Sequence, residues 1–296
     1  MAIEWLAGNR LRGTDAERLA LGPVPSLTDS GISKSNCIIY YNFDQTSGNL
    51  TNQATTANGF TNGLGSTGDG VNSGATTGQT GKVDNAWSFD GTNDQVDSGS
   101  SGALILTGDM TWAGWVNINT TTSSKVITVA SIRGDAGSNA QADNALFSFF
   151  IVQNSSPPTL RAFHENSSGT NNQVDFTTSL SEDTWYHIVF TRDVSEKTVK
   201  CYIDGSLHGS GTYSNNPTTT ASTLPLRTGG NNFSGAANSD GHFNGLLDEV
   251  SIWDRVLTAS EVSTLQETYN IIDGSIFYTT DTNKEYVLYN NTWTEV

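Results

Sequence analysis

The amino-acid sequence predicts an all-β protein built around an antiparallel two-sheet sandwich. Short segments of alternating apolar and polar residues recur along most of its 296 residues. Turn-forming residues separate these segments at intervals of about 8–12 residues, as in sandwiches. Helical periodicity is nearly absent, and hydrophobic residues make up 35% of the chain against 15% for charged residues. Much of the remainder is Gly, Ser, Thr and Asn, which is typical of turns and exposed strand faces.

The first 36 residues carry little periodicity and are predicted to form an N-terminal arm or attachment segment. A short helix is expected over Asp15–Leu21, because Gly22 and Pro23 then end the helical pattern.

Strands are predicted from Cys37 onward, where the sequence alternates or is apolar on both faces. In chain order they cover residues 37–43, 86–97, 110–119, 125–132, 145–152, 159–164, 173–177, 185–192, 199–209 and 226–229. The pair Asp204-Gly205 predicts a tight hairpin turn, since both residues tolerate positive φ. The polar run over residues 44–81 is predicted to be a long loop.

A closing strand and a short helix are predicted over Phe243–Gln266. Leu246, Val250 and Ile252 alternate onto one face of this strand, and Asp248 falls on the same face. A buried carboxylate costs several kcal/mol unless it is compensated, so Asp248 requires a partner.

The helix after this strand begins at a capping box, in which Thr258 is followed three residues later by Glu261. Beyond it, residues 270–296 are predicted to form a small C-terminal β meander, with strands at 276–279 and 285–289 and a last segment reaching Trp293.

The charge balance limits the possible partners. With 14 basic and 30 acidic residues the net charge is −16, which argues against nucleic acid and anionic membranes as partners. No run reaches the roughly 18 apolar residues of a membrane span, and the N-terminus lacks a secretory signal pattern. Cys37 and Cys201 are expected to be buried free thiols, with a disulfide between them left open.

Six stretches of the chain carry a family resemblance, in the family's order. They are YYNFDQTSGN, AWSFDGTNDQVD, MTWAGWVNI, DTWYHIVFTRD, VKCYIDGSLHG and FNGLLDEVSIWDRVLTASEV. Over residues 37–269 the chain thus resembles a laminin-G-like domain of the concanavalin A-like lectin/glucanase superfamily. The resemblance implies a jelly-roll sandwich whose first and last strands lie side by side. Because this fold hosts lectins, adhesion modules and enzymes, it says less about function.

The two ends of the chain resemble segments of tailed-bacteriophage structural proteins. The segments concerned are GNRLRGTDAERLAL and DGSIFYTTDTNKEYVLYNNTWTEV. We therefore expect the ends to form one attachment module, packed together and interrupted by the sandwich. The resemblance implies a location in the virion, other virion proteins as partners and a homo-oligomer.

Catalysis is not expected. Glycoside hydrolysis needs two carboxylates across a cleft, and glucanases of this fold carry them on one strand as E-x-D-x-x-E. Here Asp248 and Glu249 are adjacent, so their side chains are predicted to point to opposite faces, and Asp254 lies beyond the strand.

The resemblance also implies a Ca²⁺ ion, for which Asp248 and Asn52 are the candidate ligands. Hydrogen bonding of Asp248 to backbone amides of the first long loop is the alternative, and the sequence leaves both open.

Glycan binding would use loop aromatic residues with polar neighbours, and Phe60, Tyr213 and Phe233 are the candidates. The same rings could instead pack onto the domain. The function expected is a non-enzymatic bacteriophage virion protein, a capsid decoration, head fibre or tail-associated protein, that displays a lectin-like domain for adhesion to host-surface glycans. A carbohydrate-binding or adhesion module of a cellular protein is the alternative.

Overall fold

The structure, a computed structural model, divides into two units. It describes residues 4–6, 10–20, 27, 30–100, 102–119, 126–132, 145–152, 157–166, 170–217, 225–230, 240–268, 274–289 and 292–296. One unit, the sandwich, comprises Ser35–Leu257, and the other, the terminal unit, combines Met1–Lys34 with Thr258–Val296. The sequence analysis placed the ends of the sandwich at residues 37 and 269. In the structure the segment after residue 257, including its helix, belongs to the terminal unit.

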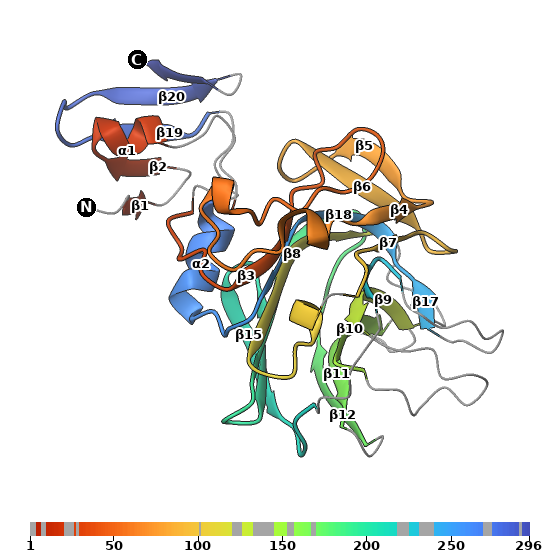
Figure 1. The fold of residues 1–296 in the computed structure, drawn as a ribbon. Coiled ribbons are helices and arrows are strands. Elements are labelled where there is room, and N and C mark those ends of the chain that lie inside the picture. Colours follow the sequence, from red (N-terminus) through yellow and green to blue (C-terminus); the bar gives the residue numbers. More distant parts are fainter. Residues whose placement is uncertain are drawn as a thin grey trace. The chain divides into compact units, whose positions relative to one another are not determined.

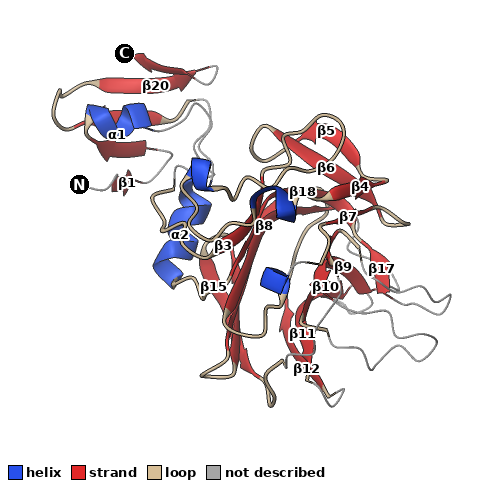
Figure 2. Cartoon of the chain, viewed as in Figure 1, coloured by secondary structure: helices blue, strands red, loops and turns tan. Residues whose placement is uncertain are grey.

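Strands dominate the described part of the chain (Figure 2). The strands of the sandwich are β3 (Cys37–Tyr41), β4 (Val71–Ser73), β5 (Thr76–Thr80), β6 (Asn85–Asp90), β7 (Gln95–Asp97), β8 (Met110–Ile118), β9 (Val126–Ile132), β10 (Phe147–Val152), β11 (Thr159–Glu165), β12 (Asn171–Thr177), β13 (Trp185–Asp193), β14 (Thr198–Ile203), β15 (Ser206–Thr212), β16 (Leu226–Thr228), β17 (Asp240–His242) and β18 (Asn244–Trp253). Short 3₁₀ turns lie at η2 (Thr56–Asn58), η3 (Gly65–Gly68) and η4 (Gly102–Leu104).

These strands form two sheets that face each other, which confirms the predicted fold class (Figure 1). The first sheet has the order β15-β14-β13-β8-β18-β6-β5, with β3 paired to β18. The second has the order β12-β11-β10-β9-β16-β7-β4, with β17 paired to β9. The pairings are antiparallel except that of β17 with β9.

The core lies between the two sheets and is rich in aromatic residues. Trp112 of the first sheet packs against Phe149 of the second at 5.8 Å between ring centroids, and Phe149 stacks on Phe190 at 4.6 Å. Burying such rings stabilises the fold by roughly 1.5–3 kcal/mol each. Cys37 and Cys201 are buried free thiols.

The first and last strands of the sandwich lie side by side, as the resemblance implied. Strand β3 pairs with β18, with Cys37 opposite Trp253. Beyond that pair the backbone N–H of Asp254 donates to the carbonyl of Asn36 at 2.7 Å, and the Arg255 guanidinium donates to the carbonyl of Ser35 at 3.2 Å. The chain therefore enters and leaves the sandwich at neighbouring points.

The predicted hairpin turn is confirmed, and the predicted long loop is corrected. The Asp204-Gly205 turn joins β14 to β15, with φ of 48° and 76°. The run over residues 44–81 is not only loop, because it contains β4 and β5. Strand β5 alternates Thr, Gly and Gln at a sheet edge, a composition without the apolar period that identifies a buried strand.

The terminal unit is a small sheet to which both ends of the chain contribute. Its strands, in the order β1-β2-β19-β20-β21, are β1 (Glu4–Leu6), β2 (Arg10–Gly13), β19 (Ile276–Thr279), β20 (Glu285–Tyr289) and β21 (Thr292–Glu295). Strand β2 pairs with β19 in parallel, with Leu11 opposite Phe277. Figure 1 shows the N- and C-terminal strands in this one sheet.

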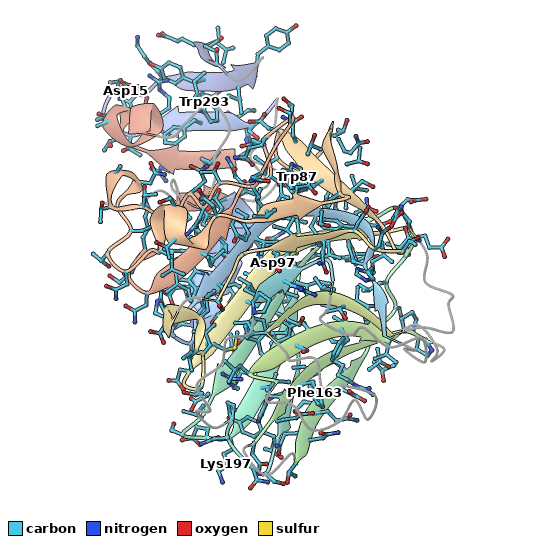
Figure 3. The ribbon with its side chains drawn as sticks, turned by 45° about the vertical axis from the view of Figure 1, so that its right-hand side comes forward. Asp15, Trp87, Asp97, Phe163, Lys197 and Trp293 are labelled. Carbon is cyan, nitrogen blue, oxygen red and sulfur yellow. The ribbon has the colours of Figure 1, made fainter. Side chains whose placement is uncertain are left out.

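One face of this sheet has its own small core. Leu11, Phe277, Tyr286 and Leu288 are buried together, and Trp293 (labelled in Figure 3) packs edge-on against Phe277 at 5.8 Å. Helix α1 (Asp15–Ala20) lies over this face, since the Arg18 guanidinium sits 3.8 Å from the centre of the Tyr286 ring.

A second helix, α2 (Ala259–Thr268), begins at the predicted capping box. The Glu261 carboxylate accepts from the backbone N–H of Thr258 at 2.8 Å, and the Thr258 hydroxyl accepts from that of Glu261 at 3.2 Å. Neither this helix nor any other in the described ranges has the length and apolarity needed to cross a membrane.

Candidate functional site

A β-bulge in β18 places Asp248 and Val250 on opposite faces of the sheet. The register of β18 against β8 shifts after Asp248, where Glu249 has a φ of 52°. Leu247, before the bulge, and Val250, after it, both lie in the core. Asp248 directly follows Leu247 and so faces away from the core, while the inserted residue brings Val250 and Ile252 to the core face. The alternation agrees with the prediction that Asp248 shares a face with Leu246, whereas the prediction that it shares one with Val250 and Ile252 is wrong.

Asp248 is nevertheless completely buried, because a loop covers it. Its Oδ2 accepts hydrogen bonds from the backbone N–H groups of Lys82 and Val83, both at 2.9 Å. A Cβ on Gly81 would lie 2.7 Å from the same oxygen, so only glycine lets the loop approach this closely. Asp248 thus binds backbone amides, as in the alternative, but these amides lie in the turn between β5 and β6, just beyond the predicted loop over residues 44–81. Its Oδ1 has no hydrogen-bond partner among the described residues.

The surroundings of Asp248 favour its neutral form. Burial raises the pKa of Asp248 well above its usual range, and the charges of Glu249 and Asp44 raise it further. The hydrogen bonds from the amides of Val83 and Lys82 act in the opposite direction and lower it. Burial also raises the pKa of Asp44, to about 6. A cation lies nearby, since the Lys82 ammonium sits 4.5 Å from the centre of the Trp115 ring.

Asn52, the second predicted metal ligand, has its side chain committed elsewhere. Its Oδ1 accepts from the backbone N–H groups of Tyr40 and Ala54, and its Nδ2 donates to the carbonyls of Ile38 and Gly65. Asn52 therefore anchors the loop after β3 to that strand.

The donor set does not fit a calcium ion. Asp248 Oδ2 and Asn52 Oδ1 each already accept two N–H groups, and the described ranges contain no cluster of three or more His, Cys, Asp or Glu side chains placed to hold a metal. The residue that the structure does bring near Asp248 is Asp44, which the sequence analysis missed. Its position directly after the first strand was the available signal.

The predicted glycan-binding aromatics are not exposed. Phe60 is 1% exposed and stacks on Tyr40 at 6.1 Å, and Tyr213 is 8% exposed. Neither presents a ring to solvent, so the prediction is wrong for both, and the alternative of packing onto the domain holds. Phe233 lies outside the described residues.

Tyr213 instead belongs to a buried polar group at one end of the sandwich. Its ring meets His164 edge-on at 4.6 Å, and its hydroxyl donates to the carbonyl of Asp193 at 3.2 Å. Burial lowers the pKa of His164 to about 4, so this imidazole is neutral at physiological pH.

Beside it, Arg192 joins the two sheets. Its guanidinium donates to the carbonyl of Leu146 at 2.7 Å, to that of Leu106 at 2.5 Å and to that of Gly108 at 3.1 Å. Burial lowers the pKa of Arg192 to about 10.

The outer face of the second sheet carries polar side chains that sequence reasoning missed. Arg161 of β11 forms a bidentate ion pair with Asp175 of β12, at 2.7 and 2.8 Å. Arg227 and Asp97 form a second pair at 3.3 Å on β16 and β7. Figure 3 labels Asp97 together with Phe163, whose ring is buried on this same sheet. Alternation in the predicted strands 159–164 and 173–177 would have placed Arg161 and Asp175 on one face.

This face can hydrogen-bond to hydroxyl groups. Guanidinium and carboxylate groups in fixed pairs offer donors and acceptors together, which suits a sugar ring. The side chains of Arg161 and Asp175 are 24% and 37% exposed. The exposed residues of β12 that alternate with its buried ones continue the polar surface.

Asp248 and Glu249 are not placed for hydrolysis. They are at most 1% exposed, and Glu249 accepts a hydrogen bond from the Tyr40 hydroxyl at 2.6 Å. A carboxyl pair that hydrolyses glycosides must reach a bound sugar, and these two do not reach solvent.

Comparison with known structures identifies similar folds at low identity. Trypanosoma rangeli sialidase superposes with a TM-score of 0.53 at 18% identity, covering 80% of this chain and 33% of the sialidase. Domain 4 of AbnA, a GH43 extracellular arabinanase from Geobacillus stearothermophilus in complex with arabinotriose, gives a TM-score of 0.52 at 21% identity, covering 78% of this chain and 98% of that domain. The binding domain of botulinum neurotoxin serotype D/C gives 0.55 at 12% identity, covering 80% of this chain and 53% of that one. At these identities the likeness concerns the fold.

At the level of sequence, no curated protein matched the chain. A family described as the concanavalin A-like lectin/glucanases superfamily does match, over residues 90–263, which is more than half of the 296 residues. The matched segment runs from the end of β6 into α2 and includes β18 with its bulge. The chain therefore belongs to the concanavalin A-like lectin/glucanase superfamily.

Proposed function

We propose that this chain is a non-enzymatic structural protein of a bacteriophage virion that displays a lectin-like sandwich for adhesion to host-surface glycans. In this proposal the terminal unit attaches the chain to the particle, as a capsid decoration, head fibre or tail-associated protein, and the sandwich binds the glycan. Assembly as a symmetric homo-oligomer is part of the proposal.

The observation that carries the proposal is the shared terminal sheet. Strands from both ends of the chain pair through β2 and β19, and the residues between them form a separate compact unit. An inserted domain of this kind can be carried by a small module without disturbing it, because the ends of the inserted domain are neighbours. The two terminal segments for which we infer a resemblance to phage structural proteins, residues 8–21 and 273–296, include β2, β19, β20 and β21 of this sheet.

The outer face of the second sheet supports the glycan-binding part of the proposal. Arg161 and Asp175 hold each other in a fixed orientation while remaining partly exposed. Such pre-organised groups lose little side-chain entropy when they bind a ligand. The fold supplies related precedent, since one similar domain was solved in complex with arabinotriose.

The absence of catalysis is supported by the burial of Asp248 and Glu249. Incubation of the full chain with host-surface polysaccharide tests it. No increase in reducing ends is expected, whereas steady release of reducing sugar would refute the non-enzymatic role.

Attachment is tested with a core variant of the terminal sheet. Phe277→Asp places a charge where the side chain is 0% exposed, and Leu207→Asp is the control, since Leu207 is 56% exposed on the sandwich. We expect Phe277→Asp chains to be missing from purified particles while their tryptophan fluorescence still reports a folded sandwich. Leu207→Asp chains should be incorporated normally. Normal incorporation of Phe277→Asp would contradict the attachment role.

Glycan binding is tested separately on a glycan array with the full chain. We expect binding that Asp175→Ala weakens, with Lys200→Ala, an exposed change on β14, as the control. Tight glycan binding by a chain that particles never incorporate would instead favour the alternative, an adhesion module of a cellular protein.

A further inference from the structure

The terminal sheet has two unlike faces. Leu11, Phe277 and Leu288 are at most 1% exposed and form the core that α1 covers. Alternation along the strands sends the residues between them to the other face. That opposite face, here called the basic face, consists of Arg10, Arg12, Ile276, Tyr278, Glu285, Val287 and Tyr289.

The basic face combines apolar and aromatic side chains that water reaches. Tyr289 is 66% exposed, and Ile276, Tyr278 and Val287 are each half-buried. Large hydrophobic residues with such exposure are rare in the described ranges, where they comprise Val71, Leu207, Tyr289 and Val296. Exposed aromatic and arginine side chains gathered on one surface are typical of the centres of protein interfaces.

Charge on this face is unbalanced at one position. The strand register places Arg10 beside Ile276, which in turn lies beside Val287. Arg10 is exposed, and no carboxylate of the described ranges forms an ion pair with it. The neighbouring row of paired residues differs, because it contains a carboxylate. There Arg12 lies beside Tyr278, with its guanidinium 6.0 Å from the ring centre, and Glu285 lies on the other side of Tyr278. An uncompensated cation in an apolar row is complementary to a carboxylate supplied by a partner.

We propose that the basic face docks onto an acidic, partly apolar protein surface of the particle, with Arg10 pairing with a partner carboxylate and Tyr289 packing beside it. The inference rests on the proposed function and adds the surface and the chemistry of the partner. The chain as a whole has a net charge of −16, so its other surfaces would be repelled by such a partner. The basic face thus orients the chain as well as attaching it.

The test uses particles prepared from phage that lack the gene for this chain, to which the purified full chain is added. Co-sedimentation gives the dissociation constant at increasing salt. Arg10→Glu and Tyr289→Ser should each weaken binding by about 30-fold or more, as loss of an interface hot spot does. Their controls are Lys200→Glu and Leu207→Ser on the sandwich, which should bind within about threefold of the wild type. Binding of the wild type should weaken with salt, and that of Arg10→Glu should depend on salt less.

The outcomes separate the two proposals. If Phe277→Asp abolishes binding while Arg10→Glu and Tyr289→Ser bind as the wild type does, the docking face is refuted and the attachment role stands. If Phe277→Asp also binds normally, the attachment role is refuted. If Arg10→Glu instead dissociates an oligomer of the isolated chain in sedimentation, the occupant is a second copy and the inference is overturned.

Discussion

Replacing Arg192 with leucine should remove the polar tie between the two sheets. The guanidinium of Arg192, which is 4% exposed, is the donor for the carbonyls of Leu106, Gly108 and Leu146. A buried carbonyl left without a donor costs about 1–3 kcal/mol, so three of them cost about 3–9 kcal/mol. Leucine also removes a buried charge, and the desolvation penalty that is thereby avoided offsets several kcal/mol of this loss. We therefore expect Arg192→Leu to lower the free energy of unfolding by about 3 kcal/mol.

Urea unfolding followed by tryptophan fluorescence at pH 7 measures this loss. Arg161→Leu is the matched control, because its ion pair with Asp175 is partly exposed and should be worth about 1 kcal/mol or less. Arg192→Lys keeps the charge with a single donor group and should fall between the two, which preserves the test if the leucine variant does not fold. An Arg192→Leu variant as stable as Arg161→Leu would refute the role assigned to these hydrogen bonds.

Three further tests concern other parts of the sandwich. Asp248→Ala should cost about 2–4 kcal/mol of stability in urea unfolding, because two N–H groups lose their acceptor, whereas Asp248→Asn should stay close to the wild type. Equal losses in both would contradict this. The raised pKa of Asp44, about 6, makes its folded form bind a proton more tightly than the unfolded chain, so its contribution is present below about pH 3.9 and is lost as the pH rises through 6. In urea midpoints between pH 4 and 8, Asp44→Asn should therefore lose less stability with rising pH than the wild type, and identical slopes would count against the shift. Gly211→Ala should lower the stability by about 1–3 kcal/mol, since its Cβ would lie 2.3 Å from Val174, while Gly102→Ala meets nothing within 4 Å and should be neutral.

The sequence predicted the sandwich because strand formation depends on local alternation. The β8 and β13 segments repeat apolar residues at period two, and the Asp204-Gly205 turn needs no tertiary information. The same logic failed at Glu249, where one inserted residue with positive φ moves Val250 and Ile252 to the core face, opposite Asp248. A bulge depends on the pairing of three strands, and no pattern within β18 alone contains it.

The candidate site residues were harder to predict, for a different physical reason. Phe60 and Tyr213 occur in polar loops, but exposure depends on what the loop folds onto, here Tyr40 and His164. Asn52 matched an expected ligand position, yet its side-chain oxygen already accepts hydrogen bonds from the backbone N–H groups of Tyr40 and Ala54. Arg161 and Asp175 become a pair only through the register of β11 against β12.

The pairing of β2 with β19 also sets the order in which the chain can mature. The amide of Asp15 donates to the carboxylate of Asp281, 266 residues later, so this contact forms only after residue 281 has been synthesised. Contacts of such sequence separation form late, and the sandwich between them can fold first as a unit. A chain cut short within the sandwich would lack β19 and leave β2 without its neighbour. The terminal sheet therefore cannot form before β19 has been synthesised, and chains cut short within the sandwich would be excluded from any assembly that recognises this sheet.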